Sequence, residues 1–76
     1  MDNDNEQRIR TKIEFFMNNK IKVHVELFDK TFLNGLLVRE IKNGVYWLVE
    51  NKLGEVFLFI KDIYDIDKYN EIEEIK

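Results

Sequence analysis

Residues 20–69 read KIKVHVELFDKTFLNGLLVREIKNGVYWLVENKLGEVFLFIKDIYDIDKY. Apolar or alternating runs are separated here only by short turn signals, which predicts closely spaced β-strands. The strongest turn signal is Asn43-Gly44, because both residues tolerate a positive φ. We expect five strands, with turns at Asp29-Lys30 and residues 52–54 and a brief helical step at Lys61-Asp62. The expected strands are residues 21–27, 31–41, 45–50, 55–60 and 63–67.

The second expected strand is long and contains Gly35. A glycine inside a strand often marks a sharp bend or a close approach of two backbones. A long strand that bends at a glycine lets a small sheet turn a corner. The pattern therefore predicts a five-stranded, strongly bent small barrel.

A helix is expected before the strands, at about residues 5–18. Asp4 and Gln7 have the spacing of a capping box, and Asn18 or Asn19 can end the helix in the left-handed conformation. Arg8, Arg10 and Lys12 lie away from the apolar stripe, and we interpret them as a solvated face rather than a binding site. The stripe consists of Ile9, Ile13, Phe16 and Met17.

The fold class is thus mainly β with an N-terminal helix, in a single domain over residues 1–76 with a loose acidic tail at 70–76. The third and fourth strands are apolar on both faces, so Phe57 and Phe59 would be exposed in a monomer. We expect the fourth strand to pair with the fifth strand of a neighbouring copy, at Ile63 and Tyr64, and to form a ring. Alternatively, the helix covers this face within one chain.

Composition limits the function. The chain has 76 residues and no Cys, which excludes disulfides and thiolate metal sites. No apolar run approaches the roughly 20 residues of a membrane span, and the acidic N-terminus is unlike a signal peptide, so a cytoplasmic location is expected. The net charge of the whole chain is −3. Residues 8–61, however, contain ten Lys or Arg and six Asp or Glu, so this middle part has a net charge of +4. The middle of the chain is thus basic and both ends are acidic. The acidic ends are interpreted either as solvated tails or as tails that compete with RNA for the basic surface.

An enzyme is not expected. His24 is the only histidine, and no Ser or Cys nucleophile and no glycine-rich phosphate loop are present. Asp62, Asp65 and Asp67 lack a glycine-turned loop around them, so no metal site is predicted, and no cofactor.

The order of one helix and five strands, with a glycine in a bent second strand, resembles the Sm-like family, which includes Sm and LSm proteins and Hfq. The matching segments are KIKVHVELFDKTFLNGLL and VFLFIKDIYDI, and Leu33-Asn34-Gly35 is similar to the family's second-strand motif. Residues 59–63 (Phe-Ile-Lys-Asp-Ile) resemble the Tyr-Lys-His-Ala-Ile step of Hfq. Gly35 with alternating strands is also common to other SH3-like barrels.

The family resemblance implies a homo-oligomeric ring of six or seven copies that binds single-stranded, U- or A-rich RNA, as an RNA chaperone would. The family's loop Asp is missing here, and Glu26 stands where Hfq has the Tyr of its adenine site. The residues expected to contact RNA are Asn43, Lys61, Lys42, Arg39, Tyr46, Phe59 and Asn34. Tyr46 and Phe59 can instead belong to the core or to an interface. The alternative function is a protein-interaction or assembly module that has lost RNA binding.

Overall fold

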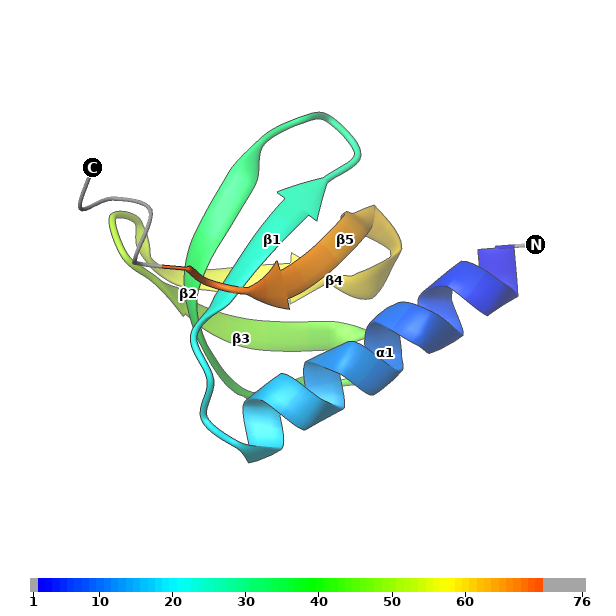
Figure 1. Ribbon diagram of the computed structural model, residues 1–76, viewed down its shortest axis with the longest axis horizontal. Coiled ribbons are helices and arrows are strands. Elements are labelled where there is room, and N and C mark those ends of the chain that lie inside the picture. Colours follow the sequence, from blue (N-terminus) through cyan, green and yellow to red (C-terminus); the bar gives the residue numbers. More distant parts are fainter. Residues whose placement is uncertain (1, 71–76) are drawn as a thin grey trace.

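The computed structural model describes residues 2–70, with side chains from Asn5 onward; the predicted tail beyond residue 70 lies outside this part. One helix precedes a single five-stranded antiparallel sheet with strand order β4-β3-β2-β1-β5 (Figure 1). The strand boundaries agree with the expected ones to within two residues. The elements are α1 (Asp2–Asn18), β1 (Val23–Leu27), β2 (Phe32–Lys42), β3 (Val45–Glu50), β4 (Gly54–Phe59), η1 (Ile60–Asp62) and β5 (Ile63–Lys68).

Strand β2 belongs to two halves of the sheet. It pairs with β1 from Phe32 to Gly35 and with β3 from Gly35 to Lys42. A Cβ at position 35 would lie 2.1 Å from the Val49 carbonyl oxygen, so only glycine lets the two backbones come this close. The register with β3 then shifts twice, after Leu37 and after Glu40. The predicted bend of the second strand is confirmed, and it wraps the sheet around one core.

The core lies on the inner side of this bent sheet, beneath the helix. Alternate residues of the strands point inward, as the period of two requires. The helical stripe predicted from the sequence closes the open side. The buried apolar side chains are Ile9, Ile13, Phe16, Val23, Val25, Leu33, Leu37, Tyr46, Leu48, Leu58, Ile60, Ile63 and Ile66.

The ends of α1 differ from the predicted ones. The helix begins at Asp2, so Asp4 lies within it and is not the N-cap. At the other end Lys20, with φ 55°, is the left-handed residue, and the Ile21 N–H donates to the Phe16 carbonyl oxygen. Asn19 does not have a positive φ, and both its backbone N–H (3.2 Å) and its side-chain amide (2.7 Å) donate to the Phe15 carbonyl. This pattern is a Schellman ending built on lysine instead of asparagine.

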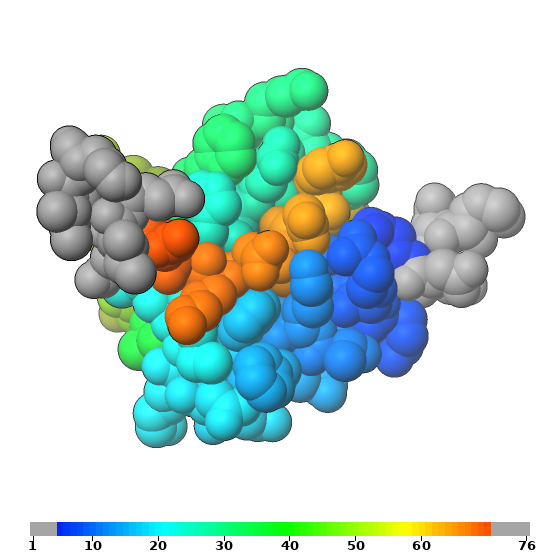
Figure 2. Space-filling model, viewed as in Figure 1, coloured from blue at the N-terminus to red at the C-terminus, as the bar shows by residue number. Residues whose placement is uncertain are grey.

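The basic residues of α1 hold the helix against the sheet. Figure 2 shows the helix packed along β5 (orange). Lys12 Nζ donates to the carboxylate of Asp65 (3.2 Å) and to the carbonyl of Ile66 (3.0 Å), and Arg8 lies 3.5 Å from the same carboxylate. The interpretation of these residues as a purely solvated face was wrong, because long side chains beside the stripe reach acidic groups on neighbouring strands.

The turn between β3 and β4 is held by one carboxylate. Glu50 is buried and accepts backbone N–H groups from Asn34 (3.0 Å), Lys52 (2.7 Å) and Leu53 (2.8 Å). These donors hold the pKa of Glu50 below its usual value. The same side chain therefore fixes both the turn and the adjoining residue of β2.

Strands β4 and β5 form the two edges of the sheet. The helix packs against β5, β2 and η1, and it leaves Phe57 and Phe59 of β4 62% and 43% exposed. The alternative in which the helix covers this face is therefore contradicted. None of the helices in residues 2–70 is long and apolar enough to span a membrane.

The close contact at Gly35 leads to a prediction. We expect Gly35→Ala to lower the free energy of unfolding by at least about 3 kcal/mol, because the new Cβ meets backbone that cannot move aside. Gly54→Ala is the control: its site is open and only its φ of +82° is strained, at a cost of about 1 kcal/mol. Urea unfolding of both variants measures this, and equal losses would contradict the proposed role of position 35.

Candidate functional site

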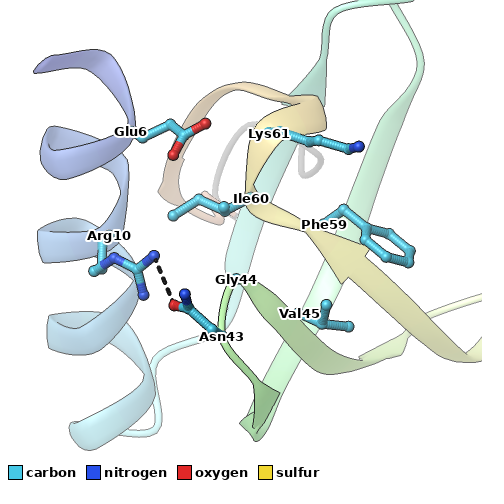
Figure 3. Close-up of a pocket in the computed structure, with 8 residues that line it drawn as sticks. All are labelled: Glu6, Arg10, Asn43, Gly44, Val45, Phe59, Ile60 and Lys61. Carbon is cyan, nitrogen blue, oxygen red and sulfur yellow. Dashed lines mark hydrogen bonds between the residues drawn. The ribbon is translucent and has the colours of Figure 1, made fainter. Parts of the chain in front are cut away.

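A hollow of about 310 Å³ lies between α1, the turn that joins β2 to β3, and η1 (Figure 3). Glu6 and Arg10 project from the helix on one side, and Val45, Phe59 and Lys61 lie on the other. Asn43, Gly44 and Ile60 lie between them. The hollow thus joins a polar side next to the helix with an aromatic and cationic side next to the sheet.

Strand pairing brings three of the predicted RNA contacts together here: Asn43, Phe59 and Lys61. Val45 pairs with Phe59 across β3 and β4, and the Ile60 N–H donates to the Gly44 carbonyl oxygen (2.8 Å). The turn after β2 and the helical step after β4 therefore lie side by side. Residues about 16 apart in sequence meet because the β3–β4 hairpin returns the chain to the same end of the sheet.

Arg10 fixes the turn from the helix side. Its guanidinium donates to Glu40 Oε2 (3.2 Å), to the Tyr46 hydroxyl (3.2 Å) and to Asn43 Oδ1 (3.4 Å). Glu40 also accepts the Gly44 N–H (3.0 Å), and this bond, with that from Arg10, holds the pKa of Glu40 below its usual value. Because a guanidinium only donates, the Asn43 oxygen must face Arg10, which leaves the Asn43 NH₂ group for the hollow.

Tyr46 does not have the predicted stacking role. Its side chain is fully buried, and burial raises the pKa of its hydroxyl. The alternation of β3 points Tyr46 inward with Leu48, while Trp47 points outward. Tyr46 is a core residue, and its hydroxyl reaches the edge of the site through Arg10 and Glu40.

The other predicted RNA contacts lie outside the hollow. The Arg39 guanidinium lies over the ring of Trp47, 5.8 Å from its centre, on the outer face of the sheet. Lys42 is exposed at the end of β2, next to Asn43. Asn34 lies near the other end of β2, where a hydrogen bond joins it to His24, which stacks on Phe32. These three residues do not form one site with the hollow.

Of the four predicted interface residues, three are exposed at the sheet edges. Phe57 and Phe59 lie on β4, and Tyr64 lies on β5, 53% exposed, with its ring against that of Phe28. Ile63 is fully buried, so its predicted interface role is corrected to a core role. The pairing of β5 with β1 shifts register between Ile63 and Asp65, so Ile63 and Ile66 are both buried although they are three positions apart.

Glu6 and Arg10 were missed as site residues. Their only signal was their spacing of four on one side of the helix, next to the apolar stripe. The sequence does not show which loop packs against that side of the helix, because this depends on contacts between distant parts of the chain. Among residues 5–70, no cluster of three or more His, Asp or Glu side chains is placed to hold a metal ion.

Comparisons with known proteins support the fold. No protein-family model and no curated protein matches the sequence. A solved structure, the 1.55 Å crystal structure of the pleiotropic translational regulator Hfq, matches with a TM-score of 0.63 and 18% sequence identity, over 75% of this chain and 92% of that chain. The chain has an Sm-like fold. The predicted fold class is therefore confirmed, from the N-terminal helix to the bent five-stranded sheet.

The Glu40 contacts predict a pH dependence of stability. Because the pKa of Glu40 is lowered in the folded state, its contribution is present at neutral pH and is lost as pH falls below about 5. We expect Glu40→Gln to cost about 1 kcal/mol at pH 7 and less at pH 3. Unfolding at both pH values measures this. Glu55→Gln, at an exposed carboxylate of β4, is the control, and an equal cost of Glu40→Gln at both pH values would contradict the role of Glu40.

Proposed function

We propose that this chain binds single-stranded RNA at the hollow and assembles, edge to edge, into a homo-oligomeric ring. The observation that carries the proposal is the meeting of Asn43, Phe59 and Lys61 from separate segments in one hollow. The proposed role is that of a binding module and not of an enzyme, in keeping with the expected cytoplasmic location.

The hollow offers the chemistry that single-stranded RNA requires. Asn43 presents a free amide donor to a base edge, and Phe59 offers an exposed ring for stacking. The Lys61 ammonium is exposed and can contact phosphate. Only unpaired bases can enter such a hollow, because a duplex keeps its bases stacked and paired.

The structural match is to a protein named as a translational regulator, and the proposal takes a role of that kind, exerted on RNA, for this chain. The expectation of U- or A-rich RNA came from the family resemblance. The residues that would carry it differ here, since the turn after β2 has no Asp and Glu26 replaces the Tyr. The proposal therefore covers single-stranded RNA as a class, with an RNA chaperone as the proposed role.

The ring is proposed from the two edges of the sheet. One edge, β4, carries the exposed Phe57 and Phe59, and the other, β5, carries the exposed Tyr64. Pairing of β4 with β5 of the next copy would continue the sheet and cover Phe57 and Tyr64, and it would leave Phe59, at the end of β4 beside the hollow, for RNA. A head-to-tail contact of this kind closes into a ring when the rotation between copies allows it.

A second candidate function is a protein-interaction or assembly module without RNA binding. It is favoured by Phe57, which is 62% exposed beside an unpaired edge, and by the acidic residues of the outer face. Asp67 of β5 lies opposite His24 of β1, and Glu26 lies two residues further along β1. Such a surface repels phosphate, so on this alternative RNA would not bind at low salt.

Assembly is tested by the native mass in solution. We expect the protein to run as a closed oligomer of about six or seven copies in light scattering after gel filtration. Phe57→Asp should reduce the mass, because it places a charge in the apolar contact. Phe15→Asp, at an equally exposed ring on the helix, should not. A monomeric wild-type protein would contradict the ring.

RNA binding is tested with a mixed-sequence 20-nucleotide single strand in 50 mM salt. We expect Lys61→Ala to weaken binding severalfold for all sequences and to flatten its dependence on salt, because a phosphate contact is lost. Lys52→Ala, at the opposite end of β3, is the control. Absence of binding by the wild-type protein would refute the RNA proposal and favour the assembly module.

A further inference from the structure

Glu6 is an unused carboxylate in the hollow. It lines the polar side, where Figure 3 shows it projecting from α1 on the side of η1. Within residues 5–70 no hydrogen-bond donor or cation is paired with it, and it forms no salt bridge with Lys61. Since the surrounding walls include the apolar Ile60 and Val45, a ligand that satisfies this carboxylate would gain a strong, charge-assisted hydrogen bond.

The charges of the hollow favour a neutral ligand group on the helix side. Arg10 is already paired with Glu40 and bonded to Asn43. The remaining charges are one negative, on Glu6, and one positive, on Lys61. Phosphate would be repelled by Glu6, so an anion fits only beside Lys61. The helix side therefore suits an uncharged group that donates hydrogen bonds.

The donor and acceptor pattern is specific. Glu6 offers two carboxylate oxygens that accept side by side, and Asn43 offers an NH₂ group that donates, since its oxygen faces Arg10. The matching edge has two adjacent donors next to one acceptor. Among the RNA bases only guanine has this edge, with N1–H and N2–H as donors and O6 as the acceptor.

We propose that this hollow binds a guanine base of single-stranded RNA, with Glu6 accepting from N1–H and N2–H and Asn43 donating to O6. This inference rests on the proposed RNA binding and specifies its base. Adenine and cytosine each place an unprotonated ring nitrogen beside their amino group, which a carboxylate oxygen repels. Uracil has one N–H between two carbonyl oxygens, which repel the carboxylate in the same way.

The rest of the hollow fits a base joined to a phosphate. Ile60 offers an apolar surface to the flat ring, and Phe59 on the sheet side can stack the neighbouring base. Lys61 lies on that same side, where the phosphate of the neighbouring nucleotide would come. The base edge is thus read on the helix side, and the backbone is held on the sheet side.

The experiment compares five RNA heptamers made of uridines that differ only in the central nucleotide. Its base is guanine, hypoxanthine (as inosine), adenine, cytosine or uracil. Binding is measured by fluorescence anisotropy in 50 mM salt. We expect the guanine heptamer to bind about tenfold more tightly than those with adenine, cytosine or uracil, as for a bidentate base contact. Inosine, which lacks the N2 amino group, should bind with intermediate affinity.

Glu6→Gln tests the carboxylate. The amide offers one acceptor and one donor, so the preference for guanine should disappear while binding of the uridine heptamer changes little. Glu14→Gln, at an exposed carboxylate two turns along the same helix, should keep the preference. The inosine comparison uses the wild-type protein and is independent of the folding of either variant.

The outcomes separate this inference from the proposed function. Equal binding of all five heptamers would overturn the guanine assignment and leave RNA binding intact. A guanine preference that persists in Glu6→Gln, or that does not distinguish inosine from guanine, would overturn the role of Glu6. Binding of none of the heptamers would overturn both proposals.

Discussion

The contact between the backbones of β2 and β3 at Gly35 is the constraint on which the structure depends. Gly35 pairs with Val23 on one side and with Glu50 on the other, so β2 can serve both halves of the sheet only if no side chain is present there. The resulting bend encloses the core. The strand order leaves β4 and β5 as the two edges of the bent sheet. The proposed ring therefore rests on the strand order, and the enclosed core rests on the bend at Gly35.

The same bend positions the hollow. Beyond Gly35, β2 carries Glu40 beneath the helix, where Arg10 joins it to Tyr46 and Asn43. The bond from Arg10 orients the Asn43 amide before any ligand arrives, which reduces the rotamer entropy lost on binding. The apolar stripe of α1 brings Glu6 to the opposite wall. Core packing and the chemistry of the site are therefore set by the same elements.

Much of the fold follows from local sequence patterns. The alternation of β1, the Asn43-Gly44 turn and Gly35 predicted the strands and the bend, because each depends only on neighbouring residues. Tyr46 was misplaced because β3 is apolar on both faces, so alternation does not say which face is inner. Ile63 was misplaced because the pairing of β5 with β1 shifts register next to it, which breaks the alternation. Arg10 and Glu6 were not assigned to the site because their role depends on residues 30 or more positions away. Local sequence patterns do not contain the register between strands or the contacts between residues that are far apart in the sequence.

The charge distribution bears on how RNA would be recognised. The basic stretch of the sequence suggested a phosphate-binding surface, but the helix uses its cations internally: Arg8 and Lys12 with Asp65, and Arg10 with Glu40. Arg39 lies over Trp47. With these cations engaged and the net charge at −3, general attraction to phosphate is weak. Affinity at this surface must therefore come mainly from hydrogen bonds and stacking at individual bases, with Lys61 as the cation of the hollow that can contact phosphate.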